Sequence, residues 1–120
     1  MNERDPAYLW DMHAAALEVV RILDGVSLGA FTTSILLCRA TERCLEIIGE
    51  AARRVSPECI EANPHIPWRD IIGQRNILAH EYGQVDHELV YRTAIRDIPV
   101  LVSQLEALLS AVETATTDKK

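Results

Sequence analysis

The sequence predicts an all-α protein, an antiparallel bundle of about four to five helices. Apolar residues recur at steps of three and four along most of the 120-residue chain, which is the spacing of one helix face. Residues with β-branched side chains do not alternate for long with polar ones, as a half-exposed strand would require. The predicted connections are short, which favours antiparallel neighbours within a single domain.

The first predicted helix begins at Asp5 and Pro6 and ends at Asp24-Gly25. An aspartate can accept hydrogen bonds from the free amides of a helix start, proline suits the first turn, and glycine commonly follows a helix end. His13 falls within the apolar pattern of this helix, so we expect its imidazole to be packed or hydrogen-bonded. A short turn or a single helical turn is predicted at residues 27–31.

A second long helix is predicted from about Thr33 to Val55. Its small residues form a seam that permits close approach of another helix and offers a surface for self-association. The seam consists of Leu37, Thr41, Cys44, Ile48, Ala51 and Val55. Charged residues occupy the other positions, and we expect them to form a solvated face with opposite charges three or four residues apart. These residues are Arg39, Glu42, Arg43, Glu46, Glu50, Arg53 and Arg54.

Prolines and capping residues mark the elements that follow. Ser56-Pro57 starts a short helix, and Pro67 lies in the first turn of a central helix that runs from Trp68 to about His80. Asp86 is then expected to cap the last helix.

The last helix contains Pro99, which predicts a kink near Asp97. We expect residues 113–120 to be frayed, because the apolar pattern stops before them. The sequence thus predicts one domain over residues 1–113 and a polar C-terminal tail over residues 114–120.

The charge balance opposes a broad nucleic-acid-binding surface. The formal net charge is −6, whereas phosphate contacts require clustered cations. A small catalytic cleft with local arginines remains compatible with this charge.

Composition also argues against several other classes of protein. No apolar run approaches the length of a membrane span, and no signal peptide is recognisable. Cys38, Cys44 and Cys59 are odd in number and lack paired spacing, which opposes a disulfide framework or a zinc site. We expect small apolar cysteines in a reducing compartment, a cytoplasmic location, no membrane partner, no metal and no cofactor.

Three residues near the end of the central helix have chemistry that packing does not require. Arg75 carries a planar cation that matches phosphate oxygens, His80 can exchange a proton near neutral pH, and Tyr82 offers a hydroxyl. Each helical residue advances by about 100°, so Arg75 and Tyr82 share a face while His80 points elsewhere. The three can converge if the helix ends before His80, or if a second copy contributes its own set across a two-fold axis.

An arginine and a histidine without a carboxylate cluster suit metal-free cleavage of RNA. The imidazole can remove the proton of a 2′-hydroxyl, and the guanidinium can stabilise the charge that builds on phosphorus. DNA lacks this hydroxyl, so no DNA substrate is expected. The residues alone leave another interpretation open, in which Arg75 forms an ion pair, His80 lies near a helix C-terminus and Tyr82 lies at the surface.

The sequence around these residues resembles the HepT-like toxins of the HEPN superfamily, over residues 4 to about 112. The shared motif is Arg, four residues, His, one residue and Tyr. The matching blocks, in order, are Arg4-Asp5-Pro6, Ile47 to Ala52, Ile66 to Gly73, Arg75-Asn76 with His80 and Tyr82, and Val85-Asp86. Gln74 departs from the apolar residue that is usual at its position.

The resemblance implies a HEPN-type helical bundle that forms a homodimer with paired motifs facing each other. It implies a metal-independent RNase toxin with an RNA substrate, in which Arg75 and His80 are catalytic and Asn76 is a supporting polar residue. Tyr82 would be modified with AMP by a cognate minimal nucleotidyltransferase antitoxin. The alternatives are a non-catalytic adaptor that binds a nucleotide or a partner, and a plain structural homodimer.

Overall fold

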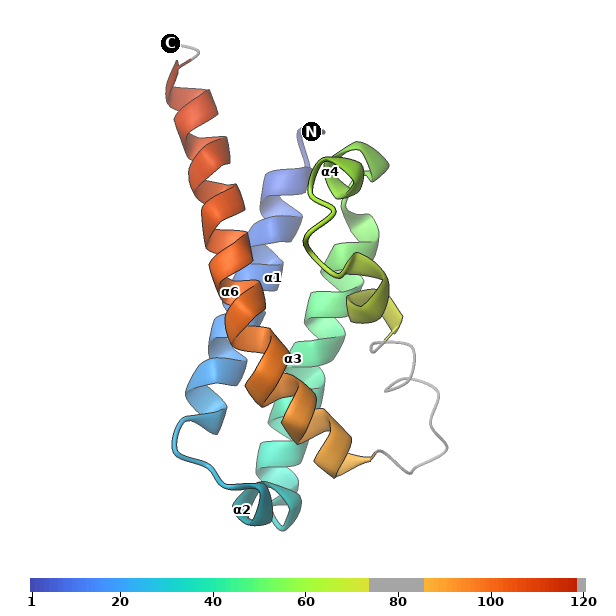
Figure 1. Cartoon of the computed structure of the whole chain (residues 1–120), viewed down its shortest axis with the longest axis vertical. Helices are drawn as coiled ribbons and strands as arrows, with labels where there is room; N and C mark the ends of the chain where they lie inside the picture. The colour runs from blue at the N-terminus through green and yellow to red at the C-terminus, as the bar shows by residue number, and fades with distance from the viewer. Residues whose placement is uncertain (74–85, 119–120) are drawn as a thin grey trace.

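The regular structure of the described residues is entirely helical, as predicted (Figure 1). The computed structural model describes residues 1–73 and 86–118, with side chains as far as residue 114. The helices are α1 (Asp5–Leu23), α2 (Leu28–Thr32), α3 (Ile35–Arg54), α4 (Pro57–Ala62) and α6 (His87–Asp118). Residues 68–73 are also helical, which confirms the start of the central helix.

Helix α1 is the centre of the bundle. It makes the most extensive contacts with α3 and with α6, and it runs antiparallel to both (Figure 1). Leu9, Met12, Ala16 and Val19 are fully buried along α1. A helix that is buried against two neighbours needs a wide apolar face, and the steps of three and four along α1 supply it.

The start of α1 differs from the prediction. Asp5 is fully buried, and its side chain makes no capping bond to the amides of its own helix. Its Oδ1 accepts a hydrogen bond from the backbone N–H of Ser56 at 2.8 Å. Its Oδ2 accepts from the Ser56 hydroxyl at 2.6 Å and from the Asn2 N–H at 2.8 Å. Asp5 therefore joins the beginning of α1 to the junction between α3 and α4.

The other helix starts follow local capping rules. Ser27, Ser34 and Ser56 each accept a hydrogen bond from a backbone N–H three residues ahead, at the starts of α2, α3 and α4. Gly25 follows the end of α1 with a φ of 72°, a conformation that side chains other than glycine rarely adopt. The predicted short elements after α1 and α3 are confirmed.

The seam of small residues on α3 is buried within the chain itself. Thr41, Cys44, Ile48 and Ala51 are all buried, on the helix that packs most extensively against α1. The Cys44 thiol donates a hydrogen bond to Oε2 of Glu18 on α1 at 3.3 Å. The expectation that this seam serves self-association was therefore wrong, because α1 occupies it.

The charged face of α3 is largely as predicted. Ion pairs three or four residues apart join Arg39 to Glu42, Arg43 to Glu46 and Glu50 to Arg54. Glu42 is the exception to the solvated face, because only 7% of it is exposed. Its carboxylate nevertheless forms an ion pair with Arg39 at 3.4 Å, because a buried charge requires a partner.

Helix α6 begins as predicted but ends later. The Leu89 N–H donates to Oδ1 of Asp86 at 3.0 Å, which confirms the cap. Pro99 lies inside a helix that continues on both sides of it, and the axis of α6 changes direction in its first half (Figure 1). The helix continues to Asp118, so the predicted fraying from residue 113 was wrong. Ala111 and Glu113 have high helix propensity, which favours continuation of the helix beyond the apolar pattern.

No helix among the described residues combines the length and the apolar character needed to cross a membrane.

Candidate functional site

The four predicted site residues, Arg75, Asn76, His80 and Tyr82, lie outside the described residues, within the span 74–85. Their roles remain predictions. The structure does describe both segments that flank the motif, and each is anchored to the core.

The segment that leads into the motif is fixed by buried side chains. Trp68 is 6% exposed, and its indole Nε1–H donates to the carbonyl of Asn63 at 2.9 Å. Ile66 and Ile71 are buried beside it in the same core. Because the Trp68 ring is buried and its N–H is hydrogen-bonded, this residue fixes the position of the helix at residues 68–73. The helix that precedes Arg75 in sequence thus starts from a defined position.

On the C-terminal side of the motif, the described chain resumes at Asp86 and enters α6, whose first turns are anchored to the core. The Tyr91 hydroxyl donates to the carbonyl of Val26 at 2.5 Å. The centroids of the Tyr91 and Phe31 rings are 5.4 Å apart. Val90 is buried next to it. These contacts tie α6 to α2 and to the connection between α1 and α2. In Figure 1, residues 68–73 and the start of α6 lie on the same side of the molecule.

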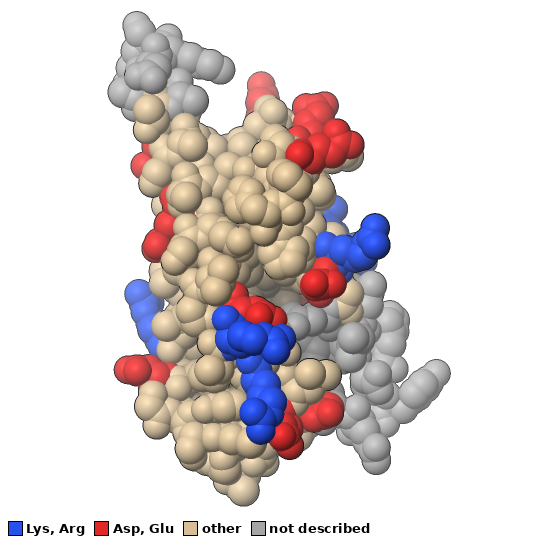
Figure 2. Space-filling model, in the orientation of Figure 1, with Lys and Arg blue, Asp and Glu red and all other residues tan. Residues whose placement is uncertain are grey.

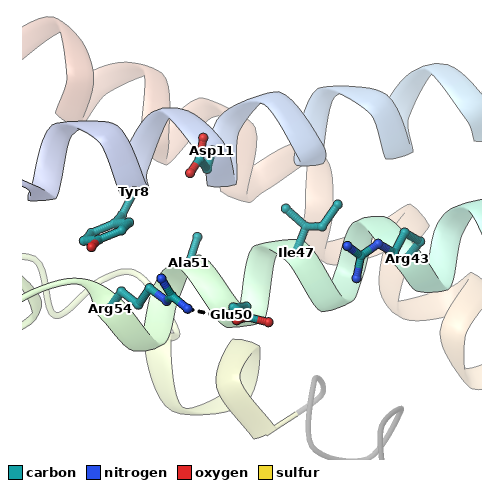
Figure 3. Close-up of a pocket in the computed structure, with 7 residues that line it drawn as sticks. All are labelled: Tyr8, Asp11, Arg43, Ile47, Glu50, Ala51 and Arg54. Atoms are coloured by element: carbon teal, nitrogen blue, oxygen red, sulfur yellow. Dashed lines mark hydrogen bonds and ion pairs between the residues drawn. The ribbon is translucent and has the colours of Figure 1, made fainter.

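A groove of about 290 Å³ lies between α1 and α3 (Figure 3). It is lined by Tyr8, Asp11, Arg43, Ile47, Glu50, Ala51 and Arg54. Figures 1 and 3 both place the helix of residues 68–73 alongside α3, and Figure 3 shows it on the side of Glu50. The lining contains two acids and two arginines, and Arg54 is paired with Glu50 at 3.2 Å. Because its acids and arginines balance in number, the groove does not present a strongly positive surface.

The surface charge agrees with this picture. Figure 2 shows one face of the molecule, on which acidic and basic side chains are scattered and often adjacent. Arg92 pairs with Glu88 and Arg96 with Asp97 on α6. The described atoms of this face carry no continuous basic patch, as the net charge of −6 predicts.

The three cysteines are free thiols, and all are buried. Burial raises the pKa of Cys44 to about 11, and the hydrogen bond to Glu18 and its charge act in the same direction. Burial also raises the pKa of Cys38 and Cys59. All three are therefore protonated near neutral pH and poorly suited to act as nucleophiles or metal ligands. Among residues 1–73 and 86–118, no group of three or more His, Cys, Asp or Glu could hold a metal ion.

Two histidines have surroundings that the sequence did not reveal. His13 Nε2 lies 3.1 Å from Oε2 of Glu106, so its imidazole is hydrogen-bonded as expected, but to a partner 93 positions away. His87 lies two positions after the span 74–85, and its buried Nδ1 has no hydrogen-bond partner in the part of the chain that the structure describes. No local pattern identifies the partner of His13, because the contact joins distant segments.

Comparison with known proteins identifies the family. Residues 12–108 match the family model described as "Ribonuclease HepT-like". The chain belongs to the HepT-like ribonuclease family. This match covers most of the chain, including the motif span, and it confirms the resemblance found in the sequence.

Curated relatives agree with the family match. "Putative RNase MJ1380" of Methanocaldococcus jannaschii is 33% identical over 88% of this HepT-like chain and 98% of its own length. "Putative RNase TTE0752" of Caldanaerobacter subterraneus is 35% identical over 76% of the chain and 81% of its own length. "Probable ribonuclease HepT" of Thermococcus cleftensis is 39% identical over 58% of the chain and 63% of its own length. No solved structure gives a significant match.

Proposed function

We propose that this HepT-like chain is the RNase toxin of a toxin–antitoxin pair and acts in the cytoplasm. The observation that carries the proposal is that a member of this family has an arginine and a histidine five positions apart, followed by a tyrosine. The names of its relatives support RNA as the substrate class.

In the proposed mechanism, the neutral imidazole of His80 removes the proton of a ribose 2′-hydroxyl. The resulting oxygen attacks the adjacent phosphorus and displaces the 5′-oxygen of the next nucleotide. This leaving oxygen takes a proton from water, and the His80 imidazolium returns its own proton to solvent, so that the products are a cyclic phosphate and a free 5′-hydroxyl. Arg75 holds the phosphate and stabilises the charge that develops on it, and Asn76 supports the cleft as a hydrogen-bonding group. No step requires a metal ion.

The proposed assembly is a homodimer in which each subunit contributes Arg75 and His80 to one cleft. Two copies solve the problem that these side chains point in different directions on one intact helix. Because α1 covers the small-residue seam of α3, the dimer must use another face.

The central experiment is RNA cleavage in the presence of EDTA by the wild type and by Arg75→Ala and His80→Ala variants. We expect the wild type to cleave, and each variant to be slower by about a hundredfold or more, since each loses one catalytic group. Arg69→Ala is the matched control, because Arg69 is exposed and lies outside the motif. Circular dichroism checks that all variants fold.

Two results would contradict the proposal. Undiminished cleavage by both motif variants would remove the mechanism. A wild type that binds ATP or AMP but cleaves no RNA would instead support a non-catalytic adaptor.

We further propose that the cognate nucleotidyltransferase attaches AMP to Tyr82. A bulky group with a negative phosphate in the cleft would block RNA by crowding and by charge repulsion. Mass spectrometry after co-expression with the nucleotidyltransferase should find the adduct on Tyr82 and lose it in Tyr82→Phe. Tyr91 is an internal control, because its hydroxyl is already bonded to Val26. An adduct found only on Tyr8 or Tyr91 would contradict this assignment.

A further inference from the structure

The groove between α1 and α3 has different chemistry on its two walls (Figure 3). The α1 wall contributes Tyr8 and Asp11. The α3 wall contributes two arginines and Glu50, with Ile47 and Ala51 as an apolar surface. A volume of about 290 Å³ suits one small ligand rather than a segment of another protein.

Asp11 presents its carboxylate to solvent and to the groove rather than to another side chain. It is exposed, and it makes no hydrogen bond or ion pair among the residues that the structure describes. The hydroxyl of Tyr8, which lies three positions away on the same helix face, has no hydrogen bond within this part of the chain either. The α1 wall therefore offers a ligand a carboxylate acceptor beside a phenol ring.

The two arginines of the α3 wall can bind an anion. Figure 3 shows the guanidinium groups of Arg43 and Arg54 reaching toward each other along α3. Each forms an ion pair with a glutamate, at 3.4 Å for Arg43 and 3.2 Å for Arg54, but the two arginine side chains are 70% and 60% exposed. Ion pairs at such exposure contribute little to stability. Since a guanidinium has five N–H donors, a phosphate can bind beside the glutamate or replace it.

A ligand of this groove must satisfy cations and a carboxylate together. A bare polyphosphate would meet the arginines but would be repelled by Asp11. A nucleotide has both kinds of group, because its phosphate accepts hydrogen bonds and its base donates them. Its flat base also matches the apolar surface of Ile47 and Ala51 beside the ring of Tyr8.

The carboxylate also discriminates among the bases. A carboxylate only accepts hydrogen bonds, so it pairs best with two donors side by side. Guanine presents N1–H and N2–H on one edge, whereas adenine and cytosine each present a donor next to an acceptor, and uracil presents one donor between two acceptors. We infer that the α1–α3 groove binds a guanine nucleotide, with Asp11 accepting from N1–H and N2–H while Arg43 and Arg54 hold the phosphate. The inference concerns binding alone and does not depend on RNA cleavage by Arg75 and His80.

The test is calorimetric titration with the four nucleoside 5′-monophosphates. We expect GMP to bind with a Kd of about 1 mM or tighter, and about tenfold or more tightly than AMP, CMP or UMP. Bound GMP should shift the NMR signals of the Tyr8 ring. Asp11→Asn should weaken GMP by about tenfold without weakening AMP, because an amide offers one donor and one acceptor and so matches adenine better than guanine.

The arginine variants test the phosphate contact separately from the base contact. Arg43→Gln and Arg54→Gln should each weaken all four nucleotides by a similar factor of about fivefold or more, since they remove a charged donor and leave Asp11 in place. Arg53→Gln is the matched control, because Arg53 is an exposed neighbour of Arg54 that does not line the groove. It changes the net charge by the same amount and should leave the affinity within about twofold.

A free nucleotide and a guanosine within an RNA strand offer the same base and phosphate chemistry. A short single-stranded RNA with 2′-O-methyl groups, which has no 2′-hydroxyl to attack phosphorus, separates the two sources. With one guanine among adenines, it should bind more tightly than GMP if the groove holds RNA, and no more tightly if the groove holds a free nucleotide. No binding of GMP at about millimolar concentration would overturn the inference, as would an unchanged preference for GMP in Asp11→Asn.

Discussion

Asp5 is a buried carboxylate whose charge is stabilised mainly by hydrogen bonds from Ser56 and Asn2, with a smaller contribution from the N-terminal amino group. Burial by itself raises the pKa of Asp5, but the bonds from Ser56 and Asn2 outweigh it and hold the pKa below the ordinary value of 3.8. The ionised form is therefore the one that stabilises the fold.

Replacing Asp5 by Asn should destabilise the protein by about 1–3 kcal/mol, because an amide cannot accept bonds from all three donors. The folded pKa lies below the unfolded one, so the stabilisation is fully present above pH 3.8 and is lost as the pH falls through the folded pKa. Urea unfolding should give a constant difference between wild type and Asp5→Asn near neutral pH, and a shrinking difference below about pH 4.

The control for this prediction is Asp11→Asn, on the exposed side of the same helix. Its effect on the free energy of unfolding should stay within about 0.5 kcal/mol. A difference between wild type and Asp5→Asn that grows in acid would show that the buried carboxylate is protonated in the folded state.

Single residues were also where sequence reasoning was least informative. The capping roles of Ser56 and Asp86 depend on amides three residues ahead, so a local pattern is enough to predict their helices. Asp5 has the same capping chemistry, yet its strongest partner is 51 positions away. Glu106 likewise pairs with His13 across 93 positions. Nothing in a helical repeat specifies such partners.

At the scale of elements, α1 is packed from two sides and carries small residues where its neighbours approach. Ala15 and Ala16 are buried, while Ala14 on the same turn is exposed. The repeat of apolar residues on α3 correctly predicted a buried seam. It could not tell whether the covering helix belongs to the same chain or to a second one, because both would bury the same residues.

Ala16→Leu should lower the free energy of unfolding by about 1–3 kcal/mol, because three extra carbons must fit into a filled core between α3 and α6. Ala14→Leu adds the same atoms to the exposed face of the same turn and should change stability by less than about 0.5 kcal/mol. Chemical denaturation of the two variants measures both effects. Similar values for the pair would mean that α1 is not tightly packed at Ala16.

At the scale of the whole molecule, the family and the helical class were predictable from sequence because both depend on patterns spread over most of the chain. Only the identity of the candidate site residues, and not their arrangement in space, could be predicted from the sequence. Candidate residues could be named from the spacing of Arg75, His80 and Tyr82, but these lie in the span 74–85, outside the described residues, and the proposed convergence also requires a second subunit. The described structure supplies the anchored flanks on either side, at Trp68 and at Tyr91.

The dimer proposal makes a further prediction for the intact protein. Light scattering should give a mass of twice the 13.4 kDa of the chain. Since the α3 seam is covered by α1, the dimer face must lie elsewhere, and charged substitutions on that face should lower this mass. A monomeric mass at the concentrations where RNA is cleaved would contradict a cleft built from two subunits.

Helix α6 extends past the start of α1, and its last turns project from the body of the molecule (Figure 1). The hydroxyl of Thr114 bonds back to the carbonyl of Ser110 at 3.0 Å, within a helix that continues to Asp118. The projecting end of α6 is therefore a suitable place to attach a probe. A spin label or fluorophore attached at Thr114 would report the orientation of the whole bundle while leaving the buried core intact.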